Sequence, residues 1–463
     1  MLRKESYIRR RQTLRDKIKE GIIILPGNNE APKNYFDNAY NFRQDSTFLY
    51  FFGLNMAGLT AIIDVDAEKD MLFGNDFTVD DIIWMGPQPS LKELGAQVGV
   101  EETAPACKAA EVIEEAIRKG RRIHFLNPYR SDTALQLSRW TGIHPDMMIK
   151  HFSTDLNIAI AEMREVKDEE EIAELENAFE IGYQMHTRAM KATKPGVTER
   201  EIAGLIKGTA ESFGDGVSFH SIVSQHGETL HNHSHDGILE AGRLLLIDIG
   251  GENLNNYCSD HTRTIPVSGK FSPKQKDIYN IVLSAVDKVF EVAAPGKYMN
   301  VFNEALKTLA EGLIGVGLMK GNAADAVEAG AVWMFMPHGL SHGIGLDVHD
   351  CENLGERGLS DFSALAARAN EIDTCIMRNN WRLRPGTVMS NEPGIYFIPA
   401  LIEKWKSEKR HEEFINYSKL ESYYDFGGIR IEEDVLITEN GNRRIGLNKR
   451  IPATIEEIEN FMA

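Results

Sequence analysis

The feature that most constrains the fold is an internal repeat in the C-terminal part of the chain. Two Pro-Gly pairs, Pro195-Gly196 and Pro295-Gly296, lie 100 residues apart, and each stands between two segments with the apolar spacing of amphipathic helices. Thr198 and Glu201 have the spacing of a capping box, and Ser272-Pro273 is typical of a helix N-terminus. A strand-rich segment with many histidines and acids follows each helix pair. The repeat therefore predicts an α+β domain with two similar helix–helix–sheet halves.

The first 160 residues follow a different pattern, in which short apolar runs alternate with helical segments. We expect buried strands over 21–25, 59–65 and 122–126, and an amphipathic helix over 111–120. A long amphipathic helix then begins near Asp168 and ends at the first Pro-Gly pair. The sequence therefore predicts an α/β domain over residues 1–160 and a second domain over residues 161–463.

Composition excludes several classes of protein. The 463 residues carry a formal net charge of −18, which disfavours a nucleic-acid partner because a phosphate backbone repels such a surface. The sequence has no run of 18 apolar residues and no apolar N-terminal signal segment, so we expect no membrane association. The four cysteines form no C-x-x-C pair. These observations favour a cytoplasmic protein.

Acidic residues follow apolar runs at several distant places in the second domain. Asp248 ends the run LLLID, and Asp260 precedes TRTIPV, with a glycine- and asparagine-rich stretch between them that fits a hairpin. Glu392 precedes Pro393-Gly394, and Glu432 follows Arg430 at the alternating spacing of one strand face. Each acid taken alone is equally well explained as a turn, cap or solvated strand residue. Two carboxylates held close together repel each other unless they are protonated or share a cation.

Residues 338–350, HGLSHGIGLDVHD, concentrate three histidines and two aspartates in a glycine-rich stretch. Buried histidines and carboxylates are costly unless they are paired or bound to a cation. Carboxylates with an imidazole suit Mn²⁺ first, and then Co²⁺, Fe²⁺ or Zn²⁺. Bridging carboxylates would hold two such ions, an arrangement that lowers the pKa of a water molecule and supports hydrolysis. The sequence therefore predicts a hydrolytic site with two divalent metal ions.

The separated motifs together resemble the prolidase and aminopeptidase P family, the two-domain pita-bread metallopeptidases. The resemblance covers nearly the whole chain and is carried by LIDIGGE, SDHTRT, HGLSHGIGLDVHD, NEPGIYF and GGIRIEED, by the junction AEMREVKDEEEI, and by YNFRQDSTFLYFFGLN near the N-terminus. It implies a creatinase/prolidase N-terminal domain with a ribonuclease H-like fold and a pita-bread catalytic domain with pseudo-two-fold symmetry.

The resemblance also implies roles for individual residues. The metal ligands that it implies are Asp248, Asp260, His342, Glu392 and Glu432, with Mn²⁺ as the usual activator. The catalytic residues that it implies around the metals are Glu392, His231, His349, Arg430 and His338, with Glu392 as the proton carrier. Tyr396, Arg430 and Trp84 are the implied substrate contacts. Trp84 corresponds to a tryptophan near a neighbouring subunit's site, and a place in the domain core is the alternative.

One spacing departs from the family pattern. Asp260 follows Asp248 by 12 residues, where the family pattern has 11. A longer hairpin loop or a bulge would absorb the extra residue. A register shift would instead turn one aspartate away from the site, and Glu252 or Asp236 would then be the substitute ligand. The remaining histidines of this region, His220, His226, His233 and His235, are expected to be surface residues or to lie behind the ligands.

The activity implied by the resemblance is hydrolysis of an N-terminal Xaa-Pro bond in proline-containing peptides. Ser341 in HGLSH favours an aminopeptidase, which cleaves longer peptides, whereas the segment 63–73 and the insertion after Tyr396 resemble large prolidases, which cleave dipeptides. A metal-free pita-bread domain that binds a partner is the alternative of another class, although such domains lack several of the ligands. The family commonly forms dimers or tetramers, so a homo-oligomer is expected.

Overall fold

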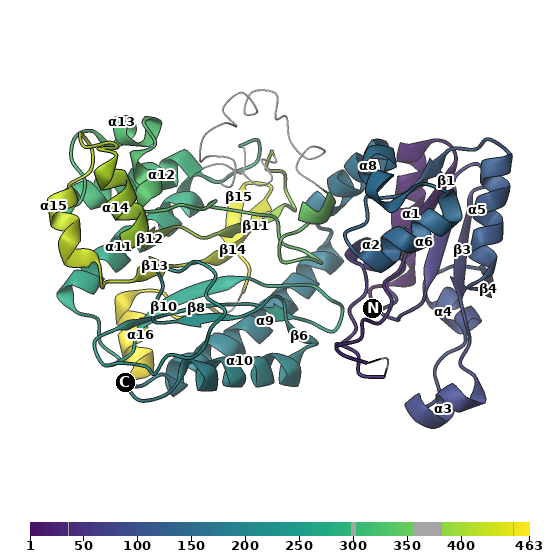
Figure 1. The fold of residues 1–463 in the computed structure, drawn as a ribbon, viewed down its shortest axis with the longest axis horizontal. Helices are drawn as coiled ribbons and strands as arrows, with labels where there is room; N and C mark the ends of the chain where they lie inside the picture. Colours follow the sequence, from purple (N-terminus) through teal and green to yellow (C-terminus); the bar gives the residue numbers. More distant parts are fainter. Residues whose placement is uncertain (36, 298–301, 355–381, 448) are drawn as a thin grey trace. The chain divides into compact units, whose positions relative to one another are not determined.

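The computed structural model describes residues 1–35, 37–297, 302–354, 382–447 and 449–463 (Figure 1). The chain divides into two compact units. One unit holds Met1–Arg164 together with Asn353 and Leu354, and the other holds Glu165–Glu352 and the described residues after 381. Helix α8 (Thr154–Glu165) ends at this division. The predicted domain limits, 1–160 and 161–463, stay a prediction.

The first unit is built on a five-stranded sheet with the strand order β4-β3-β2-β1-β5. Its central pairs are antiparallel and its two edge pairs are parallel. The strands are β1 (Ile22–Pro26), β2 (Thr60–Asp64), β3 (Lys69–Gly74), β4 (Glu102–Pro105) and β5 (Ile123–His124). The helices are α1 (Lys4–Ile18), α2 (Ser46–Phe52), α3 (Val79–Met85), α4 (Leu91–Gln97), α5 (Lys108–Arg118), α6 (Ser131–Thr141), α7 (Met148–His151) and α8. Apolar side chains of β1 and β3 pack against α5 in one buried core, so the predicted α/β fold is confirmed.

Helix α3 stands apart from this core. All seven of its residues are described, and each is at least partly exposed. The exposed fractions are 73% for Val79, 70% for Ile83 and 86% for Trp84. A core position for Trp84 is therefore wrong, and α3 presents an unusual apolar surface on the first unit.

The second unit contains the predicted pair of halves. The first half consists of α9 (Glu169–Ala192), α10 (Glu199–Phe213) and the sheet β10-β8-β7. The second half consists of α11 (Pro273–Val292), α12 (Phe302–Gly315) and the sheet β11-β14-β15, with the pair β12–β13 beside it. In Figure 1, α9 and α10 run along one side of the strands, and α11 and α12 lie toward the other. The two halves confirm the predicted pita-bread organisation.

The bounds of the remaining elements follow. The strands are β6 (Gly216–Val217), β7 (Ile222–Ser224), β8 (Leu244–Ile249), β9 (Gly251–Glu252), β10 (His261–Pro266), β11 (Val388–Asn391), β12 (Gly394–Tyr396), β13 (Gly428–Arg430), β14 (Glu433–Thr438) and β15 (Gly441–Arg444). The helices are α13 (Ala323–Glu328), α14 (Pro399–Ser407), α15 (Tyr417–Leu420) and α16 (Ile455–Met462). The insertion after Tyr396 forms α14 and α15, and most of the 351–384 insertion lies outside the described residues. No helix in the described part of the chain has both the length and the apolar character needed to cross a membrane.

The two Pro-Gly turns occupy equivalent places in the two halves. Gly196 and Gly296 have φ angles of 89° and 85°, in the left-handed region that glycine enters without a steric penalty. The N–H of Gly196 donates to the Leu239 carbonyl oxygen at 2.8 Å, and that of Gly296 donates to the Leu383 carbonyl oxygen at 2.8 Å. Each turn therefore ties its helix pair to a segment that leads into a strand of its own half.

Candidate metal centre

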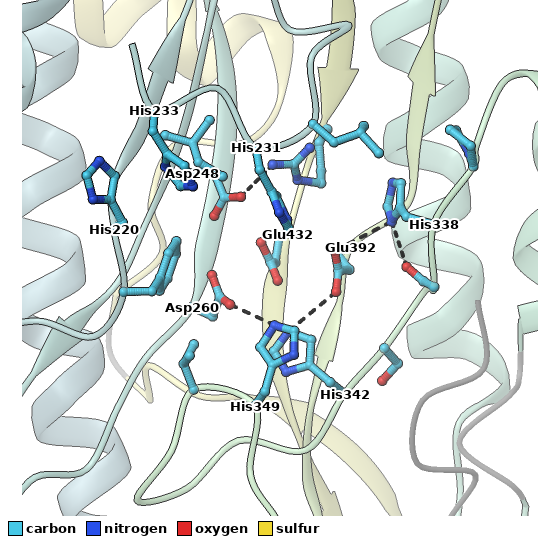
Figure 2. A pocket seen from close by; sticks show the side chains of 18 residues that line it. His220, His231, His233, Asp248, Asp260, His338, His342, His349, Glu392 and Glu432 are labelled. Carbon is cyan, nitrogen blue, oxygen red and sulfur yellow. Dashed lines mark hydrogen bonds and ion pairs between the residues drawn. The ribbon is translucent and has the colours of Figure 1, made fainter. Parts of the chain in front are cut away.

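Five side chains from distant parts of the second unit line one cavity of about 500 Å³. Figure 2 shows the four carboxylates around its centre, with the imidazole of His342 below them. We refer to this set as the metal wall: Asp248, Asp260, His342, Glu392 and Glu432. Within it, Asp248, Asp260 and Glu432 have ligand atoms within 4.8 Å of one another, and so do His342, Glu392 and Glu432. Glu432 belongs to both groups, as a residue that bridges two ions would.

The register of one hairpin sets the two aspartates side by side. Asp248 in β8 lies opposite Thr262 in β10, and Asp260 precedes Thr262 by two residues. Residues two apart in an extended chain share a face, so both carboxylates point into the cavity. The loop between the strands contains Asn256 with a φ of 65°. The 12-residue interval therefore leaves both aspartates on the same side.

The two substitute ligands lie elsewhere in the described chain. Glu252 is buried in β9, where its Oε1 accepts a hydrogen bond of 2.8 Å from Asn256 Nδ2. Asp236 forms an ion pair with Arg200, and its side chain is 74% exposed. Neither residue is among the described residues that line the cavity.

His342 is presented by a loop that is hydrogen-bonded to β11. The N–H of Ser390 donates to the His342 carbonyl oxygen at 2.9 Å, and the His342 N–H donates to Ser390 Oγ at 3.0 Å. The ring Nδ1 lies 3.1 Å from the Gly343 carbonyl oxygen, to which it can donate only if it carries a proton. Nε2 lies 3.5 Å from Asp260 Oδ2 and 3.4 Å from Glu392 Oε1. The arrangement leaves Nε2 as the ligand atom that faces the carboxylates.

Two hydroxyl groups orient the glutamates of the metal wall. Thr262 Oγ1 donates to Glu432 Oε2 at 2.7 Å, and Ser390 Oγ donates to Glu392 Oε1 at 3.3 Å. Both hydroxyls are buried, and both belong to strands that also position other ligands. The sequence motifs alone did not identify these supporting residues.

The electrostatics of the metal wall require positive charge. One oxygen of Asp248, one of Asp260 and one of Glu432 are buried without a hydrogen-bond partner among the described residues. Burial, and then repulsion from Asp248, raises the pKa of Asp260 well above its usual range. Burial, and then repulsion from Asp260, does the same to the pKa of Glu432. Divalent cations would remove this cost and give the three oxygens partners. The donor set therefore fits hard or borderline divalent metal ions.

Burial and charge also act on the remaining two ligands. Burial raises the pKa of Glu392, although His342 and Arg430 oppose this shift. Burial alone would lower the pKa of His342, but Glu392 and Glu432 outweigh it, so the net shift is upward. The histidine and its carboxylates thus stabilise each other's charged forms.

Arg430, Tyr396 and His338 form a connected network at one side of the cavity. Arg430 pairs with Asp248, and its Nη1 donates to the Tyr396 hydroxyl at 2.7 Å. His338 Nε2 lies 2.8 Å from the same hydroxyl, and its Nδ1 lies 2.7 Å from the Gly339 carbonyl oxygen. Burial, assisted by Arg430, lowers the pKa of His338 to about 3, so the ring is neutral. Its proton therefore sits on Nδ1, and Tyr396 donates to Nε2.

The other histidines occupy two places. His349 stacks on His342 with ring centroids 3.8 Å apart and an interplanar angle of 16°. Its ligand atom also lies within 4.8 Å of those of Asp260 and His342, so it is within reach of a metal at that position. The exposed residues His220, His231 and His233 line the cavity on the side of Asp248, and we call them the histidine rim (Figure 2). His226 and His235 are not among the described lining residues.

One acidic residue of this region has a role that the sequence did not indicate. Asp434 is buried, and its Oδ2 accepts a hydrogen bond of 3.2 Å from the N–H of Asp260. The alternation in IEED places Asp434 two residues after Glu432, which was a usable signal for a second inward acid. Asp434 fixes the backbone beside Asp260. Trp84, the remaining predicted site residue, belongs to the first unit of the chain.

Comparisons with known proteins agree with this geometry. The family model for Metallopeptidase family M24 matches residues 173–439, and the model for the aminopeptidase P N-terminal domain matches residues 7–124. The human protein named Xaa-Pro dipeptidase is 30% identical over 455 residues, which cover 96% of this chain and 88% of the human protein. A protein named probable Xaa-Pro aminopeptidase from Botryotinia fuckeliana is 32% identical over 457 residues, which cover 96% of this chain and 92% of that protein.

Solved structures agree as well. The zinc-substituted aminopeptidase P of Escherichia coli, in complex with product, superposes with a TM-score of 0.81 at 27% sequence identity. The match covers 100% of this chain and 98% of the Escherichia coli chain. Both domains of that enzyme therefore have counterparts in this chain.

Proposed function

We propose that this chain, which belongs to the prolidase and aminopeptidase P family of M24 metallopeptidases, is an exopeptidase. It removes the N-terminal residue from peptides that begin Xaa-Pro. The chain is a metallopeptidase, and its relatives include proteins named for both Xaa-Pro aminopeptidase and Xaa-Pro dipeptidase activity. Cleavage next to proline is a distinct chemical task, because the bond is a tertiary amide and the ring obstructs a normal extended fit.

The observation that carries the proposal is the set of three buried carboxylate oxygens that lack hydrogen-bond partners within the described chain and face one cavity beside His342. We propose that the five residues of the metal wall would hold two divalent ions, and that Mn²⁺ would be preferred over Co²⁺, Fe²⁺ or Zn²⁺. When bound, the ions supply an activated water molecule and polarise the scissile carbonyl group.

The protein side chains then handle protons and position the substrate. Glu392 is the candidate proton carrier to the proline nitrogen, because its carboxylate belongs to the metal wall and also lines the cavity in which the substrate would bind. His231 and His349 are the candidates for hydrogen bonds to the developing oxyanion. Arg430 holds Asp248 in place, and the neutral His338 lines the cavity. Tyr396 is buried and is not among the described lining residues, so in place of a substrate contact it links Arg430 to His338 through its hydroxyl group.

Substrate length separates the two activities of the family. A dipeptidase must capture the carboxylate of the proline residue, whereas an aminopeptidase must leave that end open. Ser341 favours the aminopeptidase, and its Oγ is held by the Ser390 carbonyl oxygen at 2.6 Å. We therefore propose Xaa-Pro-Yaa peptides as the substrates, with dipeptide hydrolysis as the second candidate because a full-length relative carries that name.

The test compares matched peptides on Mn²⁺-loaded protein. Xaa-Pro-Yaa should be cleaved after Xaa, the dipeptide Xaa-Pro slowly or not at all, and the matched control Xaa-Ala-Yaa not at all. Cleavage confined to the dipeptide would replace the aminopeptidase by the dipeptidase. No cleavage of either proline peptide by protein that holds about two Mn²⁺ per chain would reject the proposed function.

We also propose a homo-oligomer that acts in the cytoplasm and uses Trp84 near a neighbouring subunit's site. The support is the exposed apolar surface of α3, on which Val79, Ile83 and Trp84 are largely uncovered. Trp84→Ala should then shift the mass measured by light scattering toward the monomer.

A further inference from the structure

A buried ion pair holds the end of the loop that joins the two stacked histidines, His342 and His349. Lys167 Nζ lies 2.9 Å from Asp350 Oδ2, and both side chains are only 1% exposed. Two charges removed from water in this way are costly, and Lys-to-Asp pairs of such burial need a specific reason. Lys167 directly precedes the N-cap of α9, far from the loop in sequence, and the proposed reaction does not use it.

Asp350 lies where the two ends of this loop meet, next to Gly343, and we call this pair of residues the neck of the loop. Its N–H donates to the Gly343 carbonyl oxygen at 2.8 Å, and its Oδ1 accepts from the N–H of Asp347 at 3.4 Å. A side chain on Gly345 would approach the Asp350 carboxyl carbon to 2.7 Å, so the loop is wrapped closely around this carboxylate. Residue 343 follows His342 and residue 350 follows His349. The neck therefore sets the separation of the two histidines.

Lys167 is itself fixed at its backbone. Its N–H donates to the Gly386 carbonyl oxygen at 2.9 Å, and Val166 forms a β-bridge with Thr387. Strand β11 begins at Val388, and the Ile344 N–H donates to the Val388 carbonyl oxygen at 3.1 Å. The first half of the loop is thus anchored directly to β11. Lys167 connects the second half, through Asp350, to the residues just before the same strand.

We propose that Lys167 and Asp350 are positioning residues that hold His349 in its stack on His342. The Nδ1 of His349 also lies 2.8 Å from Glu352 Oε1, which orients the ring once the neck has placed its backbone. The ion pair places the backbone and Glu352 places the ring. Loss of the pair moves His349 away from the reacting carbonyl group and leaves the five metal ligands in place.

The experiment separates positioning from simple stabilisation. Single variants such as Lys167→Met leave a buried charge without its partner and destabilise the protein, so they are not informative alone. The double variant Lys167→Met/Asp350→Leu removes both charges and replaces them with side chains of similar size. We expect its Tm to return to within a few degrees of wild type and its Mn²⁺ stoichiometry to be unchanged. We expect its kcat to stay at least about tenfold low, with KM little altered.

A double-mutant cycle with His349→Ala identifies the route of the effect. If the pair acts through His349, adding His349→Ala to the double variant lowers kcat by less than about twofold further, because the interaction is already lost. Recovery of kcat together with Tm would show that the pair is merely structural and would overturn the inference. The inference would also be overturned if the kcat loss of the triple variant equalled the product of the losses of the double variant and of His349→Ala. The ion pair would then act at a place other than His349.

A control outside the site uses the ion pair of Lys449 and Glu180, which joins α9 to the C-terminal segment at 2.6 Å and whose side chains are 46% and 40% exposed. The variant Lys449→Met/Glu180→Leu should keep kcat within about twofold of wild type. The kinetic readout rests on the proposed function, but the experiment can reject the proposed function and the positioning role separately. An inactive wild-type protein would reject the function, whereas an active one with a fully active double variant would reject only the positioning role.

Discussion

The metal wall and the histidine rim face the same cavity but are built in opposite ways. Asp248, Asp260, His342 and Glu432 are buried, and one polar atom each of Glu432, His342 and Asp248 is fixed by Thr262, the Gly343 carbonyl oxygen and Arg430. The rim residues His220, His231 and His233 are exposed and lie against other imidazoles. The ring centroids are 4.3 Å apart for His220 and His233, and 6.3 Å apart for His231 and His233.

The difference teaches where each part can tolerate change. Buried carboxylates at the metal wall cannot be hydrated, so a change of charge there alters the whole site. Exposed imidazoles at the rim remain in water, so a rim histidine that does not contact the substrate loses little when it is replaced by another polar side chain. We therefore expect the effects of substitution to fall steeply from the wall to the rim.

The largest effect is expected for Glu392→Gln. The amide has nearly the same shape but carries no transferable proton, so kcat should fall by about 10²–10⁴-fold, the range that a general acid or base contributes. Steady-state kinetics with an Xaa-Pro-Yaa peptide measures this loss, and circular dichroism controls for folding. Near-normal kcat with a normal metal content would remove Glu392 from the proton-transfer role.

A smaller effect is expected at Arg430, which binds a residue of the metal wall but is not itself a proposed metal ligand. Arg430→Lys keeps the positive charge, but a lysine cannot bind Asp248, Tyr396 and Thr262 with separate nitrogens as Arg430 does. We expect activity or metal affinity to fall by about 10–100-fold, as is usual for groups that orient metal ligands. Titration of metal-free protein with Mn²⁺ and peptide kinetics distinguish the two. An unchanged variant would mean that only the charge matters at this position.

Removal of the metal should make the stability of the protein depend on pH, because the carboxylates of the metal wall then lack their cations. Asp260 and Glu432 have raised pKa values in the metal-free fold, so the native state keeps protons that the unfolded chain releases above about pH 4. Metal-free protein should therefore lose stability as the pH rises, while Mn²⁺, which binds deprotonated ligands, should stabilise more.

The gain in Tm on adding Mn²⁺ should accordingly be several degrees larger at pH 8 than at pH 5.5, as measured by differential scanning fluorimetry. Asp260→Asn, which removes one of the two repelling charges, is the control and should flatten this dependence. A gain in Tm that does not vary with pH would mean that the carboxylates of the metal wall do not hold protons in the metal-free fold.

Most of the wall could be predicted from sequence, and the reasons are local. Asp248 and Asp260 sit at the ends of recognisable strands, and a hairpin needs only short-range geometry to bring them together. The helix pairs were equally visible, since Asp168, Thr198 and Ser272 cap their helices as the spacing predicted. Strands β1, β2 and β5 of the first unit follow from its apolar runs in the same way, whereas β3 and β4 were not predicted.

Other features depend on contacts that no local pattern encodes. Lys167 and Asp350 are 183 residues apart, and nothing in either neighbourhood distinguishes a buried pair from two solvated charges. The stack of His349 on His342 depends on how the intervening loop closes. Trp84 illustrates the converse case, because an apolar helix that the sequence allows in a core is exposed in the first unit.

The smallest effect is expected at the histidine rim, with His220→Asn/His233→Asn. Burial, and then the neighbouring His233 and His235, lowers the pKa of His220, so the ring is neutral at pH 7 and carries no charge that the site would lose. Asparagine remains polar at both positions. We expect kcat/KM for an Xaa-Pro-Yaa peptide to change by less than about threefold.

His231→Asn is the comparison within the rim, because His231 is a candidate oxyanion donor. This variant should lower kcat/KM by at least about tenfold. Equal losses of kcat/KM in the two variants would mean that His231 has no special role among the rim histidines. A loss in His220→Asn/His233→Asn as large as that of Glu392→Gln would mean that His220 and His233 take part in catalysis.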